Sequence, residues 1–247
     1  MPQATPKKRL IMLKETQYEH SRVLQDKADQ YTHEHFSPLF WKKHGLVIGS
    51  AQGRGTTWFV KSGSLELALR HYHRGGLFGK LVKDHYLFSG WARTRAYQEF
   101  NVLLHLKHAG VNVPTPIAAH IIKRNPFSYS ADILTEKISQ AKDLATLLQE
   151  GPIPKDTYKK IGQEIAKMHN ANVDHTDLNI RNILINNLNH VWIIDFDKCV
   201  IRKQGKWKSG NLHRLLRSFR KESADIYWQE EDWQTLINGY NKEISTL

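Results

Sequence analysis

Alternation of apolar and polar residues predicts short β-strands in the first half of the chain. The clearest case places Leu65, Leu67 and Leu69 on one face of a strand, with Ala68 and Arg70 on the other. Such a strand would bury its leucines and leave Arg70 facing a different environment. Further apolar runs that predict strands lie at 46–48, 56–60, 117–122 and 131–134.

Apolar residues at steps of three and four predict helices farther along the chain. The first covers 94–106 and ends near Gly110, ahead of Val113 and Pro114. A Gly-Pro pair within 149–154 separates two further helices. The later apolar stripes are, in chain order, Tyr158, Ile161, Ile165 and Met168; Leu212, Leu215, Leu216 and Phe219; and Trp233, Leu236, Ile237 and Tyr240.

Three polar residues surround a predicted hairpin formed by the apolar runs 183–185 and 191–194. This hairpin would bring Asn182 and Asp195 side by side, and their oxygens are the kind of ligand that Mg²⁺ prefers. Asp177, on a loop that follows a helix, could accept a proton from an attacking hydroxyl group. Acidic residues on a hairpin are often only solvated. Here several residues of the required types occur together at the required spacing, which argues against that interpretation.

Composition indicates a folded, soluble protein. At 247 residues and 40% hydrophobic content, the chain can form one large domain or two lobes. Its single cysteine, Cys199, excludes an internal disulfide and a cysteine zinc site. The apolar run 10–13 is too short for a secretory signal, and no stretch reaches the length of a membrane span, so we expect a cytosolic protein.

Positive charge is unevenly distributed. The net charge is +12, and segment 198–221 carries nine Lys or Arg residues without one acidic residue. Such blocks favour anionic partners, which include nucleotide phosphates, nucleic acid and a membrane surface. The predicted helix around Arg214 and Arg217 would either contact an anionic membrane or substrate, or pack into the fold with a solvated basic rim.

Two segments have less certain roles. His71 and His73 open a basic corner that continues through Arg74. Because no acidic or cysteine ligand follows closely, we expect anion contact there rather than a metal site. Residues 1–35 are polar and compatible with helix, and we interpret them as an N-terminal extension.

The catalytic-loop residues resemble a known pattern. His-x-Asp-Leu-x-x-x-Asn at 175–182, followed by Asp-Phe-Asp at 195–197, is similar to the motifs of the protein-kinase-like superfamily. Thr176, Asn179 and Asp197 depart from the protein-kinase pattern. Thr176 replaces the usual Arg, so control by a phosphorylated activation loop is not expected. Asn179 replaces a frequent Lys, so another cation must balance the transferred phosphoryl group. The resemblance implies an α+β bilobal fold that uses ATP and Mg²⁺.

The same resemblance implies lobe boundaries and residue roles. It gives a small antiparallel N-lobe with one helix over 36–138 and a larger, mainly helical C-lobe over 139–247. Asp177 would orient and deprotonate the acceptor, and Asn182 and Asp195 would hold Mg²⁺. Residues implied to secure the nucleotide are Gly53, Arg54, Gly55, Arg70 and Glu99. Arg70 stands where kinases usually carry lysine, so the geometry there must differ.

Two longer stretches, 69–76 and 211–218, resemble the bacterial Kdo kinases, relatives of the lipopolysaccharide core heptose kinases. The likeness implies transfer of a phosphoryl group from ATP to the 4-hydroxyl of Kdo on a lipid A precursor. It also implies a peripheral location on the cytoplasmic face of the inner membrane. Arg74, Arg214 and Arg217 would then contact the anionic glycolipid, and no nucleic acid is expected.

Three alternatives remain open on the sequence alone. Another protein-kinase-like enzyme, acting on a protein or an aminoglycoside, would use the same acidic residues. A nucleic-acid-binding module could use the same net charge, but it would leave the spacing of Asp177, Asn182 and Asp195 unexplained. A catalytically dead scaffold is conceivable because of Arg70.

Overall fold

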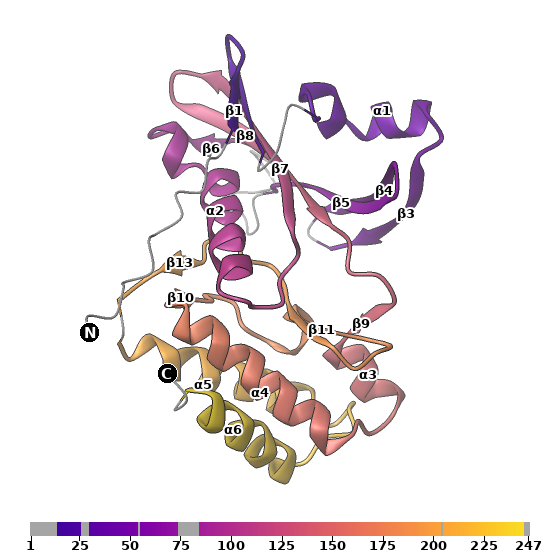
Figure 1. Cartoon of the computed structure of the whole chain (residues 1–247), viewed down its shortest axis with the longest axis vertical. Helices are drawn as coiled ribbons and strands as arrows, with labels where there is room; N and C mark the ends of the chain where they lie inside the picture. The colour runs from indigo at the N-terminus through magenta and orange to yellow at the C-terminus, as the bar shows by residue number, and fades with distance from the viewer. Residues whose placement is uncertain (1–13, 26–29, 54, 74–83, 204, 245–247) are drawn as a thin grey trace, which may run out of the picture.

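The computed structural model describes residues 14–25, 30–53, 55–73, 84–203 and 205–244. A β-rich lobe and a mainly helical lobe follow one another along the chain and stack along its long axis (Figure 1). The predicted α+β, bilobal, protein-kinase-like fold is confirmed.

One antiparallel sheet forms the N-lobe. Its strands run in the order β1-β2-β7-β8-β5-β4-β3, with β6 paired to β8. Adjacent strands are joined by hairpins or lie next to the hairpin β7–β8, as expected for an antiparallel sheet. The strands are β3 (Val47–Gln52), β4 (Thr56–Ser62), β5 (Leu65–His71), β6 (Tyr86–Leu87), β7 (Pro116–Asn125) and β8 (Ser128–Glu136), preceded by β1 (Lys14–Gln17) and β2 (Ser21–Gln25).

The hairpin β1–β2 differs from the N-terminal extension that we expected. Its second strand pairs with β7 from Ser21 opposite Ile122 to Gln25 opposite Ala118. Val23 and Leu24 are buried on this strand. Residues 14–25 therefore extend the sheet as strands, although their polar composition had suggested only a helix-compatible tail.

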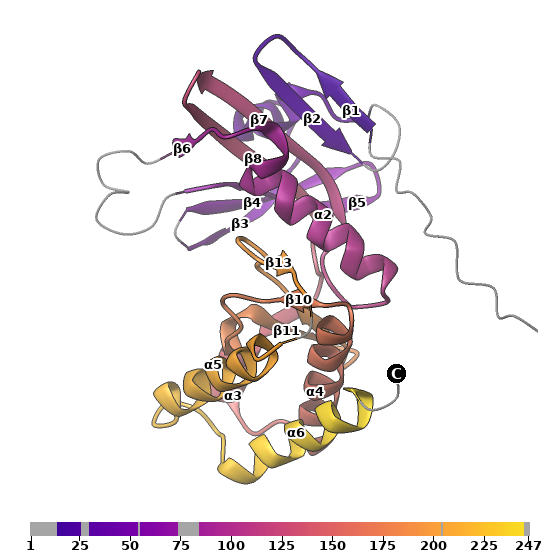
Figure 2. The same ribbon diagram turned by 90° about the vertical axis from the view of Figure 1, so that its left-hand side faces the viewer.

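The two faces of β5 meet different surroundings, as the alternation predicted, although Leu65 at the start of the strand is 37% exposed rather than buried. Leu67 and Leu69 are buried in a cluster with Trp41, which lies on α1 (Pro38–Lys43) beside the short 3₁₀ helix η1 (His33–Phe36). Ala68 and Arg70 face the opposite side, toward the C-lobe. The predicted helix is α2 (Arg95–His108), preceded by η3 (Trp91–Arg93), and it packs on β7 and β8 (Figure 2).

Close helix packing forms the base of the C-lobe. Its helices are α3 (Leu144–Glu150), α4 (Lys155–Asn170), α5 (Trp207–Glu222) and α6 (Glu230–Ile244). A Cβ atom on Gly162 of α4 would lie 2.0 Å from the backbone oxygen of Leu236 in α6. A Cβ atom on Gly239 of α6 would lie 2.3 Å from the backbone oxygen of Lys159 in α4. Glycine at these two positions allows the helix backbones to touch.

Short strands of the C-lobe flank the loops that contain Asp177 and Asp195. The predicted hairpin is present as β11 (Ile183–Asn186) and β12 (Val191–Ile193), and Ile183 lies opposite Ile193. The remaining short elements are β9 (Ala141–Asp143), β10 (Val173–Asp174), β13 (Val200–Ile201) and the 3₁₀ turn η4 (Ile180–Asn182). Within the described residues, no helix has the length and apolar character needed to cross a membrane.

Candidate active site

A cleft of about 1230 Å³ lies between the lobes. The glycine-rich turn and β5 contribute from the N-lobe, and segment 135–138 passes between the lobes. The C-lobe contributes the loop before η4 and the end of β12. The predicted site residues that line this cleft are Gly53, Gly55, Arg70, Glu99, Asp177, Asn182 and Asp195.

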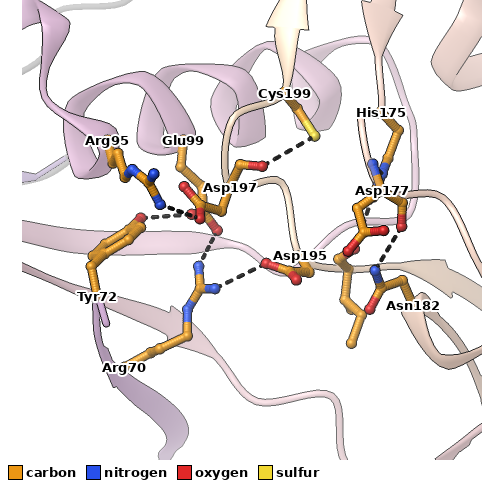
Figure 3. Close-up of polar contacts among 11 residues, drawn as sticks. Arg70, Tyr72, Arg95, Glu99, His175, Asp177, Asn182, Asp195, Asp197 and Cys199 are labelled. Carbon is orange, nitrogen blue, oxygen red and sulfur yellow. Dashed lines mark hydrogen bonds and ion pairs between the residues drawn. The ribbon is translucent and has the colours of Figure 1, made fainter. Parts of the chain in front are cut away.

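Arg70 joins both lobes across the cleft. Its Nη2 donates to Oε1 of Glu99 on α2 at 2.5 Å, and its Nη1 donates to Oδ1 of Asp195 at 3.0 Å (Figure 3). The expected ion pair between Arg70 and Glu99 is therefore present. Because a guanidinium presents a planar fork of donors, one side chain contacts two carboxylates at once.

Burial and charge together shape the protonation of this group. Glu99 is only 4% exposed and also accepts from the hydroxyl of Tyr72 at 2.6 Å. Burial raises the pKa of Glu99, and the charge of Arg70 opposes that shift. Burial also raises the pKa of Tyr72 well above its usual value. Burial lowers the pKa of Arg70, but Glu99, Tyr72, Asp195 and Asp197 together outweigh burial and raise the pKa, so the guanidinium stays charged.

Backbone contacts fix the loop that carries Asp177. Nδ2 of Asn182 donates to the backbone oxygen of Asp177 at 2.9 Å, and Asn179 donates to the same oxygen at 2.8 Å. The carboxylate of Asp177 remains exposed in the cleft. With its nitrogen engaged, Asn182 has its amide oxygen available for a cation.

His175 anchors the loop that carries Asp177 to the segment that follows β12. Its Nε2 donates to the backbone oxygen of Ile194 at 3.0 Å, and its ring packs against Phe196. Burial lowers the pKa of His175, so the imidazole stays neutral. This geometry agrees with the expectation that His175 is a packed support rather than a proton carrier.

A second carboxylate follows Asp195. Asp195 has a positive φ of 63°, a conformation that L-residues seldom adopt, and this turn directs it toward Arg70. Asp197 accepts from Arg95 of α2 at 2.8 Å through Oδ2. Its buried Oδ1 has no hydrogen-bond partner among the described residues. Asp197 lines the same cleft as Asn182 and Asp195, and its unpartnered carboxylate oxygen fits the oxygen-rich surroundings that Mg²⁺ requires.

The sequence profile described as "Lipopolysaccharide kinase (Kdo/WaaP) family" matches residues 39–240, most of the chain. The chain belongs to this family. It is therefore a kinase, a phosphotransferase with an alcohol group as acceptor.

Several relatives in the lipopolysaccharide kinase family are named 3-deoxy-D-manno-octulosonic acid kinase. The Vibrio parahaemolyticus protein is 59% identical over 81% of this chain and 85% of its own length. The Vibrio vulnificus protein is 50% identical over 94% of this chain and its full length. The Haemophilus influenzae protein is 46% identical over 88% of this chain and 94% of its own length. The predicted likeness to Kdo kinases is confirmed.

A solved structure, described as "WaaP in complex with acyl carrier protein", shares the fold. It has a TM-score of 0.56 and 18% sequence identity, and the match covers 81% of this chain and 80% of that chain. At this identity the likeness concerns the arrangement of the lobes alone.

Helix α5 contacts the catalytic loop in a way that the sequence did not reveal. Oδ1 of Asn211 accepts from the backbone nitrogen of His175 at 3.0 Å, and its Nδ2 donates to Asp174 at 2.8 Å. Oγ of Ser218 accepts from the backbone nitrogen of Ile180 at 3.1 Å. Both residues belong to stretch 211–218, which resembles the family, so that motif braces the loop on either side of Asp177.

Of the three residues expected to contact the substrate, Arg74, Arg214 and Arg217, the structure describes the last two. Arg214 donates to the backbone oxygen of His175 at 3.3 Å, so it too braces the loop. Arg217 is exposed on α5. Neither side chain lines the cleft. Arg74 and the nucleotide-binding candidate Arg54 lie outside the described residues.

The anion expectation for His71 and His73 needs correction. Both histidines contact carboxylates: Nδ1 of His71 lies 2.6 Å from Asp132, and Nδ1 of His73 lies 3.0 Å from Asp84. Asp132 comes from neighbouring strand β8, so its approach depends on sheet pairing that a local sequence pattern does not reveal. These contacts make the corner less suitable for an anion.

Proposed function

We propose that this chain transfers the γ-phosphoryl group of ATP to the 4-hydroxyl of Kdo on a lipid A precursor. The observation that carries the proposal is the convergence of Asp177, Asn182, Asp195 and Arg70 in one cleft. Relatives named 3-deoxy-D-manno-octulosonic acid kinase, which match 81% and 94% of the chain, supply the acceptor class.

Each cleft residue has a role that follows from its position. Asp177, exposed and held by its own backbone, accepts the proton of the acceptor hydroxyl and orients it. Asn182 and Asp195 would hold Mg²⁺, which supplies charge neutralisation at the phosphates. Gly53 and Gly55 let backbone amides approach the triphosphate, with Arg54 between them.

Arg70 and Glu99 secure the nucleotide from the N-lobe. Arg70 donates to Asp195 in the structure, and with nucleotide and cation bound it would also supply positive charge to the phosphates. Catalysis then consists mainly of positioning and charge neutralisation in a confined cleft.

The net charge supports an anionic acceptor at a membrane surface. Arg217 and Arg74 are our candidates for contact with the phosphates and carboxylates of the glycolipid. We extend the proposal to peripheral binding at the cytoplasmic face of the inner membrane, where a net charge of +12 favours anionic lipid.

The decisive experiment measures ATP consumption with and without a Kdo-bearing lipid A precursor, together with NMR assignment of the phosphorylated hydroxyl. We expect acceptor-dependent turnover and a phosphate on the 4-position. Turnover with a protein or an aminoglycoside, but not with the Kdo acceptor, would contradict the proposal. Tight, salt-dependent binding to RNA without turnover would favour the nucleic-acid alternative.

Asp177→Asn tests the base within this experiment. The substitution preserves shape but removes the proton acceptor, so we expect a loss of about 10²- to 10⁴-fold in transfer with ATP binding retained. The matched control is Asp156→Asn on the exposed start of α4, which should be unaffected. Near-normal turnover by Asp177→Asn would remove Asp177 from the role of base.

A further inference from the structure

Three side chains that could bind one metal ion meet where β5 ends. His71, His73 and Asp84 offer ligand atoms that all lie within 4.8 Å of one another. Oδ1 of Asp84 is 3.0 Å from Nδ1 of His73 and 3.8 Å from Nε2 of His71. In a tetrahedral zinc site, ligand atoms about 2.0–2.2 Å from the ion stand roughly 3.4 Å apart. The two separations bracket that value.

A second carboxylate holds His71 in the orientation of a metal ligand. Nδ1 of His71 is 2.6 Å from Oδ1 of Asp132, which is 10% exposed. In the neutral ring, a hydrogen bond from Nδ1 to this carboxylate leaves Nε2 without a proton and directed toward Asp84. Metal-binding histidines commonly donate their other nitrogen to a carboxylate in this way, which raises the basicity of the ligand.

We propose that His71, His73 and Asp84 bind a divalent transition-metal ion of the zinc class. Imidazole nitrogen suits zinc and its neighbours, whereas Mg²⁺ prefers an all-oxygen shell. The site is therefore chemically distinct from Asn182 and Asp195. Each of the three side chains is partly exposed, between 29% and 45%, so an ion can enter from solvent.

The proposed site adjoins the glycine-rich turn. A Cβ atom on Gly55 would lie 2.0 Å from Cδ2 of His73, so the imidazole packs directly against the backbone of that turn. An ion that fixes His73 therefore also restrains Gly55, which lines the cleft. Zinc binding and nucleotide binding are then thermodynamically coupled, in either direction.

Zinc titration of the full-length protein against a competing chromophoric chelator tests the site without any assay of activity. With millimolar Mg²⁺ present, we expect one tightly bound Zn²⁺ per chain. His73→Ala and Asp84→Asn each remove one ligand and should weaken binding at least about tenfold. Asp132→Asn touches no ligand atom, and it should weaken binding about 10- to 100-fold through the orientation of His71.

Matched controls separate this site from other histidines of the chain. His85→Ala, beside Asp84, and His44→Ala, at the end of α1, should leave zinc affinity unchanged. Circular dichroism verifies that every variant folds. Co²⁺ in place of Zn²⁺ should give d–d absorption bands that His73→Ala abolishes. The proposal is overturned if wild type binds no stoichiometric zinc, if excess Mg²⁺ displaces it, or if His73→Ala and Asp84→Asn bind as tightly as wild type.

Discussion

Arg70 shows how one residue can depart from a superfamily pattern while its partners adapt. Where a lysine would offer a single ammonium group, this guanidinium contacts Glu99 and Asp195 with separate nitrogens. Tyr72 occupies the second oxygen of Glu99, so the carboxylate is held on both sides. The residue that departs from the kinase pattern is thus held by two carboxylates in the cleft.

Replacement of Arg70 tests whether the two hydrogen bonds of its guanidinium group are needed for nucleotide binding. Arg70→Lys keeps the charge but loses one of two charged hydrogen bonds, each of which contributes about 1.5–3 kcal/mol. We expect kcat/KM for ATP to fall roughly 10- to 100-fold, measured by steady-state kinetics. Arg70→Ala should cost more, because it also leaves Glu99 buried without a cation. Equal kcat/KM for Arg70→Lys and wild type would show that charge alone suffices.

His120 carries a pH prediction. It is 4% exposed, and neither ring nitrogen has a hydrogen-bond partner among the described residues. Burial lowers the pKa of His120 from 6.5 to about 4, against the opposing effect of Asp132. Between these two values the unfolded chain binds a proton that the folded protein does not. Stability therefore decreases as pH falls from 6.5 toward 4, by up to about 1.4 kcal/mol per pH unit from this group.

Urea unfolding of wild type and His120→Leu between pH 7.5 and 5 measures this contribution. The leucine cannot bind a proton. The free energy of unfolding of His120→Leu should therefore rise relative to that of wild type as pH falls. The matched control is His85→Ala, an exposed histidine, which should follow the wild-type curve. Parallel curves for wild type and His120→Leu would contradict the lowered pKa.

At the scale of elements, periodicity predicted where helices lie but not what their polar residues contact. The apolar stripe of α5 was visible in sequence, and Leu215 and Phe219 are indeed buried. Asn211 sits on the same buried side, where its amide satisfies His175 and Asp174. Only the spatial approach of α5 to β10 reveals this role, because these partners lie about forty residues apart in sequence.

Asn211→Ala tests the bracing role of α5. The substitution leaves the buried backbone nitrogen of His175 unpaired, at a cost of about 1–3 kcal/mol in stability. Asn211 acts through the loop, so kcat should fall while KM for ATP stays near its wild-type value. His213→Ala, exposed on the same helix, should change neither. A variant that lost stability but kept full kcat would limit Asn211 to a structural role.

At the scale of the whole molecule, the sequence predicted what is local and missed what is distant. The hairpin β11–β12 could be predicted because its two strands are neighbours in sequence, and it places Asn182 and Asp195 together. The pair Arg95–Asp197 and the attachment of β2 to β7 each join segments about a hundred residues apart. No period in the sequence carries that information, so residues 14–25 were interpreted as a tail.

The distribution of charge over the molecule gives the last prediction. Arg214 contacts His175, which leaves exposed Arg217 as the cleaner probe of membrane or substrate contact on α5. Charge reversal by Arg217→Glu should raise KM for a lipid acceptor in anionic vesicles by roughly 5- to 30-fold, with KM for ATP unchanged. Lys107→Glu, an equal charge change at an exposed position of α2, is the matched control and should have little effect. If both variants raise KM equally, net charge rather than the α5 face directs the enzyme to its acceptor. If neither does, α5 has only a solvated basic rim.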